Sequence, residues 1–210
     1  IENNVYSENI MSAISAIDKE SGKYWYDTYV NGYHYIYLSV PYNGFGIYSE
    51  EQLAWLDGLL AEDAKQDKTT FVIGHYPMSY THENSAGHFD NSAELEAVLK
   101  KYPNTIYISG HTHISPEVNT NNVLIGNQET TKINTGALIS YLTAENGNRI
   151  YTPNGIYCKV FADRIEFHAR VFCNLTDGTD GYWVSNTSKV LNIKNTVNSF
   201  LTAEISADKK

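Results

Sequence analysis

The chain has 210 residues, of which 42% are hydrophobic and 13% aromatic, so it can bury one sizeable core and is not disordered as a whole. The formal net charge of −9 argues against nucleic acid held on a basic surface, and no apolar run approaches the about 20 residues of a membrane span. An anionic substrate would therefore have to be met locally, by metal ions. Only 19% of the residues are charged, and Asn, Ser, Thr and Tyr are abundant, a composition typical of an extracellular or cell-surface bacterial protein.

The first 40 residues predict a helix followed by a hairpin. Apolar residues at helical spacing, among them Ile10, Ile14 and Ile17, indicate a helix within residues 1–22. Residues 24–29 and 33–40 alternate as strands do, and the Asn-Gly pair at 31–32 between them is a strong hairpin signal. Since the chain begins with an isoleucine and shows no signal peptide, we expect a processed protein or a piece of a longer one.

A second helix is predicted from Ser49 onward. Ser49 and Gln52 have the spacing of a capping box, in which side chains bind the free backbone N–H groups at the helix start. The leucines that follow lie on one helical stripe and are expected in the core. They are Leu53, Leu56, Leu59 and Leu60.

Two apolar strands are each followed by a glycine and a histidine. Residues 71–73 lead into Gly74 and His75, and residues 105–109 lead into the Gly-His-Thr-His run at 110–113. We expect Gly110 to supply the sharp turn, because a residue without Cβ adopts backbone angles that other residues avoid. Two surface histidines in a polar loop are the alternative reading of His-x-His alone, and the repeated strand-glycine-histidine pattern favours a site.

The segment between these strands is predicted to be a helix. Asn91, three residues before Glu94, resembles a helix start, and Leu95, Val98 and Leu99 recur at helical spacing. A strand, a helix and a strand of this length form a parallel crossover, which places the C-terminal ends of both strands on one edge of the sheet. Ligands of open parallel sheets bind at that edge. His75, His111 and His113 are therefore expected to converge there, and imidazole is the commonest side chain for transition metals.

The remaining histidines carry weaker predictions. His82 and His88 lie in the polar loop of residues 78–90 next to the expected site, and loops in such places often supply substrate contacts. The alternative is a solvated loop with incidental histidines. His34 and His168 fall within expected strands, His168 facing outward opposite Tyr157, so we expect structural roles for both.

From Val123 onward short strands replace the helices, and we expect an antiparallel meander. The expected strands cover residues 123–125, 132–134, 138–142, 156–161 and 164–172. In the last hairpin Cys158 would lie opposite Phe167, which leaves Cys173 too distant for a disulfide, so both thiols are expected to be free. Residues 1–186 are expected to form the main domain, and residues 187–210 a final strand and a linker-like tail.

Three segments, in this order and spacing, resemble the later half of a calcineurin-like metallophosphoesterase. They are the run Ser-Glu-Glu-Gln-Leu-Ala-Trp-Leu at 49–56, the run Gly-His-Tyr-Pro at 74–77 and the run Gly-His-Thr-His at 110–113. The resemblance covers roughly residues 24–172. It implies an α/β (α+β) fold that is part of a four-layer α-β-β-α sandwich, with strand-helix-strand units followed by an antiparallel meander.

The resemblance also implies a two-metal site. His75 and His111 would bind one divalent ion and His113 the other, with Mn, Fe or Zn as the metals. In the family an aspartate and a water or hydroxide bridge the ions, and a histidine of an Asn-His motif assists the leaving group. No catalytic residue of that kind can be named, because the Asp-x-His, Gly-Asp-x-x-Asp and Gly-Asn-His-Asp/Glu motifs of the family are absent from the sequence.

This departure leaves three hypotheses. In the first, the chain supplies the histidine half of a metal-dependent phosphoester hydrolase and is inactive alone. In the second, it is a non-catalytic extracellular binding or scaffold domain derived from a phosphoesterase. In the third, His75, His111 and His113 form a mononuclear zinc site, since three histidines suffice for a catalytic zinc.

The expected partners follow from the first hypothesis. They are a phosphoester substrate, the missing N-terminal half of the same domain, and two divalent metal ions in the longer protein, with none or a partial complement in this chain. Without the missing half the apolar inner face of the sheet would be exposed or covered by a second copy, so a homodimer of the chain is also expected. No nucleic-acid surface and no membrane span are expected.

Overall fold

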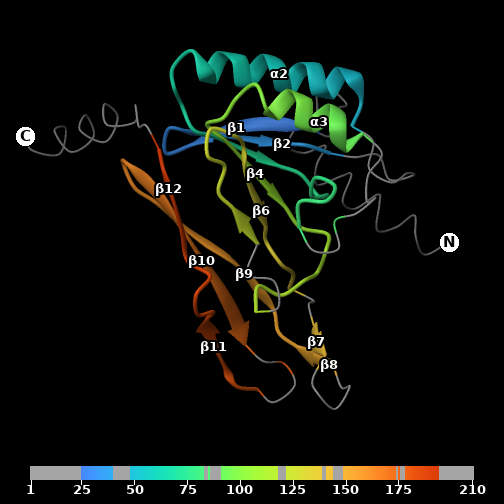
Figure 1. The fold of residues 1–210 in the computed structure, drawn as a ribbon, viewed down its shortest axis with the longest axis vertical. Coiled ribbons are helices and arrows are strands. Elements are labelled where there is room, and N and C mark those ends of the chain that lie inside the picture. The colour runs from blue at the N-terminus through green and yellow to red at the C-terminus, as the bar shows by residue number, and fades with distance from the viewer. Residues whose placement is uncertain are drawn as a thin grey trace, which may run out of the picture.

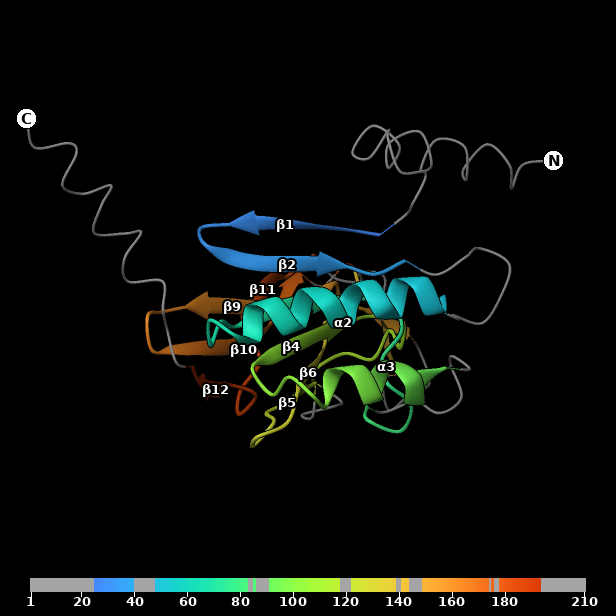
Figure 2. The same cartoon turned by 90° about the horizontal axis from the view of Figure 1, so that it is seen from above.

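The computed structural model describes residues 25–39, 48–82, 85, 91–117, 122–138, 141–143, 149–173, 175 and 178–193. Two helices cover one face of a six-stranded sheet, and a second sheet lies on its other face (Figures 1 and 2). The described part is thus an α-β-β stack of mixed α/β class. The helix expected within residues 1–22 lies outside the described residues. No helix in the described ranges is both long enough and apolar enough to cross a membrane.

The elements have the following bounds. The helices are α2 (Glu50–Ala64) and α3 (Ser92–Leu99). The six-stranded sheet has the order β1-β2-β3-β4-β6-β5, formed by β1 (Tyr26–Val30), β2 (Tyr33–Tyr37), β3 (Thr70–Ile73), β4 (Thr105–Ser109), β6 (Thr131–Asn134) and β5 (Val123–Leu124). The second sheet contains β9 (Asn154–Val160), β10 (Arg164–Cys173), β11 (Asp180–Trp183) and β12 (Lys189–Asn192), and β7 (Tyr141–Thr143) pairs with β8 (Arg149–Tyr151).

The first hairpin is confirmed. β1 and β2 pair antiparallel with Val30 opposite Tyr33. Asn31 and Gly32 have φ of 51° and 80°, the two positive values that a tight hairpin turn of this kind requires.

The four central strands are parallel, which places their C-terminal ends on one edge. β2 pairs with β3, β3 with β4, and β4 with β6, all in parallel. The crossover between β3 and β4 through α3 is therefore confirmed. The assignment of residues 132–134 to an antiparallel meander is wrong, because β6 lies beside β4 with Ile108 opposite Ile133. The sequence of residues 110–130 carries no helix signal, but this connection is long enough to form a parallel crossover.

The start of α2 fulfils the capping prediction in part. The Ser49 hydroxyl accepts a hydrogen bond from the Gln52 backbone N–H at 3.1 Å, which makes Ser49 the N-cap. The Gln52 side chain does not return to Ser49. It accepts from the Ser39 N–H at 2.9 Å and donates to the Ser39 carbonyl at 2.8 Å, so it ties the helix start to the segment that follows β2. Of the four leucines predicted to lie in the core, Leu56 and Leu60 are fully buried, and Leu53 and Leu59 pack against the same core but are only partly buried.

Asn91 marks the start of α3 as predicted, but its side chain does not cap the helix. It accepts from the Tyr48 N–H at 3.1 Å and donates to the Tyr48 carbonyl at 2.7 Å. The amide thereby fixes Tyr48, whose ring enters the core between the helices and the first sheet. That core also contains Ile36, Leu56, Leu60, Val72, Leu95, Leu99 and Tyr107.

A second core lies between the two sheets. Phe71, Ile106 and Ile133 of the first sheet pack with Ile165 and Phe167 of β10, all 3% exposed or less. Burial of side chains of this size stabilises the fold by roughly 1.5–3 kcal/mol each.

The β9–β10 hairpin has the predicted register. Cys158 lies opposite Phe167 and Tyr157 opposite His168, and both cysteines are free. The strand expected at residues 138–142 is displaced. Leu138 lies in a turn and is 69% exposed, and β7 begins at Tyr141.

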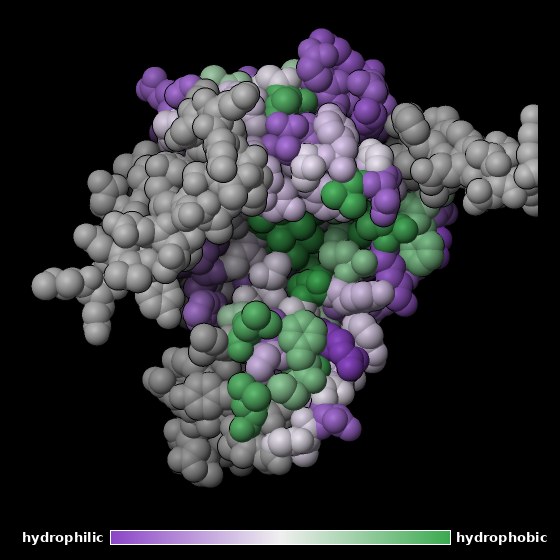
Figure 3. Space-filling model, turned by 180° about the vertical axis from the view of Figure 1, so that it is seen from behind, coloured by the Kyte–Doolittle hydropathy of each residue, from purple (hydrophilic) through white to green (hydrophobic). Residues whose placement is uncertain are grey.

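The second sheet leaves part of the inner face of the first sheet incompletely covered. Tyr33, Tyr35 and Ile108 of the first sheet, together with Ile156 of β9, pack against the second core but stay partly exposed. Seen from behind, apolar residues gather in a hollow between the upper and lower parts of the molecule (Figure 3). A hollow lined with apolar side chains is a surface that another segment or chain can cover.

His34 has a structural role, as predicted, and lies in β2 opposite Thr70, where β3 begins. It is 1% exposed, and its Nδ1 lies 2.6 Å from Asp63 Oδ2 while its Nε2 lies 3.0 Å from Asp27 Oδ2. Thr70 donates to the same Asp63 oxygen at 2.6 Å. Desolvation opposes the charged form of both His34 and Asp63, but their mutual hydrogen bond and the added partners raise the pKa of His34 and lower the pKa of Asp63.

His168 is also structural, on the outward face of β10. Its Nδ1 lies 2.9 Å from the Ser188 hydroxyl, and its Nε2 lies 3.5 Å from Glu166. The Ser188 contact joins β10 to the segment that leads into β12, whereas Glu166 lies in β10 itself.

The His34 cluster predicts a bell-shaped dependence of stability on pH. The contribution of His34 is complete below its ordinary pKa of 6.5 and is lost as pH rises through the raised value. The contribution of Asp63 is complete above its ordinary pKa of 3.8 and is lost as pH falls through the lowered value. Replacing His34 by Gln should therefore cost on the order of 3 kcal/mol of unfolding free energy between about pH 4 and 6.5, and less on either side. Urea unfolding from pH 3 to 9 measures the difference.

His168→Gln is the matched control, since His168 lies in a more exposed contact with Glu166. Its stability difference from the wild type should be small. A His34→Gln difference that stays constant from pH 6 to 9 would contradict the assignment of a charged His34.

Candidate functional site

The candidate site lies where β3 and β4 end. Ile73 pairs with Ile108, so the two chains leave the sheet side by side. The pairing continues one step beyond the strands, since the Gly74 N–H donates to the Ile108 carbonyl at 2.9 Å and the Gly110 N–H to the His75 carbonyl at 3.1 Å. Parallel pairing therefore brings His75 and His111 together, as the sequence predicts.

The two imidazoles are in direct contact. His111 Nδ1 lies 3.1 Å from His75 Nε2, with ring centroids 5.0 Å apart and the planes at 76°. The Tyr76 ring lies 4.4 Å from the ring of His111 and completes the cluster. Partial desolvation and then the neighbouring His113 lower the pKa of His75, even though the residue reaches solvent. A lowered pKa favours the neutral imidazole, which is the form that binds metal ions.

The sharp turn after β4 is made by the histidines themselves. His111 and His113 have φ of 68° and 55°, a left-handed conformation that is uncommon for residues with a side chain. Gly110 does not have a positive φ, and a Cβ placed there would meet only the Thr135 hydroxyl at an ordinary 3.6 Å. The expectation that Gly110 supplies the unusual angles is wrong. The strain lies instead at the two candidate ligands, where strained backbone in proteins tends to be found.

Gly74, in contrast, is required by its surroundings. A Cβ at this position would lie 2.6 Å from the hydroxyls of both Tyr107 and Tyr48. The Tyr107 hydroxyl donates to the Tyr76 carbonyl at 2.6 Å and so holds the turn that carries His75. Full burial and the neighbouring Tyr48 raise the pKa of Tyr107 well above its usual value, so its phenol keeps the proton that this bond needs.

Asn134 is a residue near the site that sequence analysis missed. It ends β6, the strand next to β4, and its amide donates to the Gly110 carbonyl at 2.7 Å and accepts from the Thr112 hydroxyl at 3.0 Å. A polar residue at the C-terminal end of the next parallel strand is the signal that identifies it, and the wrong assignment of residues 132–134 to a meander concealed that signal.

The structure gives less support to the roles predicted for His113, His82 and His88. His113 is exposed and near enough to influence His75, but no three His, Cys, Asp or Glu side chains of the described ranges are arranged to hold one metal ion. His82 is 7% exposed, and its backbone is tied to Ser85 on both sides, so little of it is offered to a substrate. His88 lies outside the described residues.

The His75–His111 pair fits one edge of a metal site. Two nitrogens that each bind an ion at about 2.0–2.1 Å are themselves about 3 Å apart, which matches the 3.1 Å between these atoms. Imidazole nitrogens suit Zn, Fe, Cu and Ni, whereas a site for Mn also needs carboxylate or water oxygens. Other ligands would therefore have to join the pair.

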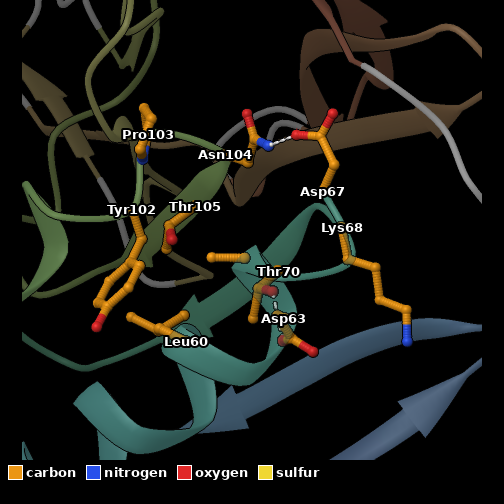
Figure 4. A pocket seen from close by; sticks show the side chains of 10 residues that line it. Leu60, Asp63, Asp67, Lys68, Thr70, Tyr102, Pro103, Asn104 and Thr105 are labelled. Carbon is orange, nitrogen blue, oxygen red and sulfur yellow. Dashed lines mark hydrogen bonds between the residues drawn. The ribbon is translucent and has the colours of Figure 1, made fainter.

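A cavity of ≈ 190 Å³ lies at the opposite edge of the sheet, where β3 and β4 begin (Figure 4). Both of its carboxylates are already engaged, since Asp63 contacts His34 and accepts from Thr70, and Asp67 accepts from the Asn104 amide at 2.6 Å. None of the candidate histidines belongs to it. The cavity is lined by Leu60, Asp63, Ala64, Asp67, Lys68, Thr70, Tyr102, Pro103, Asn104 and Thr105.

The chain is similar to known phosphoesterases in sequence and in fold. A family model described as calcineurin-like phosphoesterase matches residues 5–115, which is just over half of the chain and includes both histidine turns. A manganese-dependent ADP-ribose/CDP-alcohol diphosphatase of Arabidopsis thaliana is 36% identical over 75 residues, which are 35% of this chain and 24% of that protein.

The fold comparison agrees with the sequence comparison. A dimetal phosphatase from Danio rerio superposes with a TM-score of 0.52 at 14% identity, over 82% of this chain and 61% of that one. The present chain thus spans about a quarter of the plant enzyme and three fifths of the fish structure. The strand-end histidines, the sandwich fold and the family match together lead to one conclusion: the chain belongs to the calcineurin-like phosphoesterase family.

Proposed function

We propose that this chain supplies the histidine half of a two-metal centre in a longer phosphoester hydrolase. The observation that carries the proposal is the contact between His75 Nε2 and His111 Nδ1 at 3.1 Å, at the strand ends of a member of a hydrolase family. The plant relative is named as a diphosphatase and the fish structure as a phosphatase, which supports hydrolysis as the class of reaction.

In this proposal the three histidines act as ligands. His75 and His111 hold one divalent ion and His113 holds the other. Bound ions supply an activated water and offset negative charge on the phosphoryl oxygens. The chain's own residues bind and orient: Tyr107 fixes the turn of His75, and the lowered pKa of His75 keeps its nitrogen available. The metals are Mn, Fe or Zn, and the manganese dependence in the plant relative's name favours Mn as the first to test.

The substrate is proposed to be a phosphoester. The plant relative's name refers to ADP-ribose and CDP-alcohols, in which two phosphates are joined. A diphosphate ester of a nucleoside is therefore the first substrate class to test. The net charge of −9 supports metal ions, rather than a basic surface, as the groups that receive such an anion.

The second half of the centre is proposed to come from an N-terminal part of the same domain. The sequence lacks the aspartate motifs of the family, and the chain spans 61% of the fish structure. The partly buried Tyr35, Ile108 and Ile156 offer apolar surface that such an N-terminal part could cover. We infer that the chain alone is inactive, and that the protein acts outside the cell or at its surface, as its low charge content favours.

A non-catalytic binding or scaffold role is the second candidate. It is favoured by one observation, that the described residues form no three-ligand group of His, Cys, Asp or Glu. The same observation weighs against a mononuclear zinc site, since His113 does not complete the His75–His111 pair. The upstream coding sequence separates the candidates, because the aspartate motifs are either encoded there or not.

The first prediction is weak metal binding by this chain alone. Two paired nitrogens without a bridging carboxylate hold an ion poorly, so titration calorimetry with Mn²⁺ or Zn²⁺ should show no binding or binding weaker than micromolar. Stoichiometric submicromolar binding that disappears in His111→Ala would show that the chain carries a complete site.

The second prediction concerns the longer protein, provided that it carries the missing motifs. His75→Ala or His113→Ala should each lower kcat/KM by a factor of about 100 or more, because each removes a direct metal ligand. His82→Ala and His168→Ala are the controls and should stay near wild type, since one side chain is buried and the other bonds Ser188 and Glu166. Unchanged turnover of an aryl phosphate by His113→Ala would refute the ligand assignment.

The third prediction is self-association of the isolated chain. The partly exposed apolar residues between the sheets should be covered by a second copy, most simply in a two-fold dimer. Light scattering at several concentrations should therefore give a mass that rises toward twice 23.6 kDa. A strictly monomeric mass combined with a sharp, cooperative thermal transition would mean that the chain closes its own core.

A further inference from the structure

We propose that Asn134 is a positioning residue, whose buried carboxamide selects the backbone conformation that presents His111 and His113. The inference depends on the proposed function in one respect only, the assumption that these histidines bind metal ions. The conformational role itself follows from the contacts of the chain.

Asn134 is buried, and two of the three hydrogen bonds of its side chain go to the turn that carries His111. Asn134 is 1% exposed. Its Nδ2 donates to the Gly110 carbonyl at 2.7 Å, and its Oδ1 accepts from the Thr112 hydroxyl at 3.0 Å and from the Gly136 N–H at 3.3 Å. Its backbone N–H donates to the Asn122 carbonyl at 2.8 Å, which anchors the residue in the sheet.

These hydrogen bonds hold the turn at Gly110 and at Thr112, on either side of His111. The Thr112 N–H donates to the Gly110 carbonyl at 2.8 Å, so residues 110–112 form a three-residue turn centred on His111. With φ of 68° at its central residue, this is the rare and strained form of such a turn. Asn134 bonds the same Gly110 carbonyl and the Thr112 hydroxyl. These hydrogen bonds from outside the turn stabilise a backbone conformation that is unfavourable on its own.

The contact extends to the second histidine through Thr112. The Thr112 hydroxyl, held by Asn134, lies 3.4 Å from the Ile114 N–H, on the far side of His113. His113 also has a positive φ, 55°. The amide offers a donor for Gly110 and an acceptor for Thr112 on two separate atoms of one side chain, whereas a carboxylate lacks the donor and an aliphatic side chain lacks both.

Solution NMR of the metal-free full chain tests the proposal. A strong intraresidue amide–Hα Overhauser effect reports the positive φ of His111 and His113, and the imidazole ¹⁵N shifts report the bond between His75 and His111. In Asn134→Ala the strong effect should be lost at His111, and the ¹⁵N shifts of the two rings should move toward those of free imidazoles. Thr112→Val should weaken the same signals, whereas Thr112→Ser, which keeps the hydroxyl, should resemble the wild type.

Asn154→Ala is the matched control. Asn154 is similarly buried, donates to the Thr152 carbonyl at 2.7 Å and accepts from the Ala137 N–H at 3.2 Å, and both of these partners lie outside residues 110–113. It should lower the thermal midpoint as Asn134→Ala does but leave the His111 signals intact. Retention of the positive φ in a folded Asn134→Ala protein would overturn the proposal. If Asn134→Ala does not fold, wild-type signals in Thr112→Val would overturn it.

A second measurement separates this inference from the proposed function. In the longer protein Asn134→Ala should weaken Mn²⁺ binding by about 10- to 100-fold, the usual cost of losing a group that orients metal ligands, with Thr112→Ser near wild type. Absence of metal binding in the wild-type longer protein would refute the proposed function and leave the NMR result on Asn134 standing. Unchanged Mn²⁺ affinity in Asn134→Ala, with metal bound at the histidines, would overturn the positioning role alone.

Discussion

The parallel pairing of β3 with β4 is the constraint on which the candidate site depends. Ile73 opposite Ile108 sets the register, and the bonds from Gly74 to Ile108 and from Gly110 to His75 carry it into the turns. A shift of one residue would turn the buried side chains of a strand to the other face, so the two apolar cores on either side of the sheet hold this register firmly. The packing of these two cores therefore fixes the contact between His75 and His111, although most of the core residues lie outside the site.

Each turn that carries a histidine is held by a buried polar side chain of the neighbouring parallel strand. Tyr107 of β4 bonds the carbonyl in the turn after β3, and Asn134 of β6 bonds the carbonyl in the turn after β4. Each bond crosses from one parallel strand to the exit of its neighbour. These hydrogen bonds offset the backbone strain at His111 and His113, an arrangement expected where side chains must meet a ligand in a fixed geometry.

Local patterns predicted much of this structure, and non-local pairing accounts for the failures. The Asn-Gly hairpin, the cap at Ser49, the leucine stripe of α2 and the β9–β10 register depend on near neighbours and are confirmed. The placement of β6 beside β4 and the attachment of Asn91 to Tyr48 depend on contacts across many residues, which periodicity does not contain. At the site, topology predicted that His75 and His111 meet, but the backbone strain fell on the histidines rather than on Gly110.

The described fold holds a pair of contacting histidines at the strand ends, and its second sheet covers the apolar inner face of the first sheet only in part. The proposed function gives both features one explanation, a partner segment that would complete the core and the ligand set together. The most direct measurement is anomalous diffraction at the Mn edge from crystals of the longer protein grown with Mn²⁺. The account predicts one ion against His75 and His111 and a second against His113. Density at neither place, or ions bound only by other residues, would contradict it.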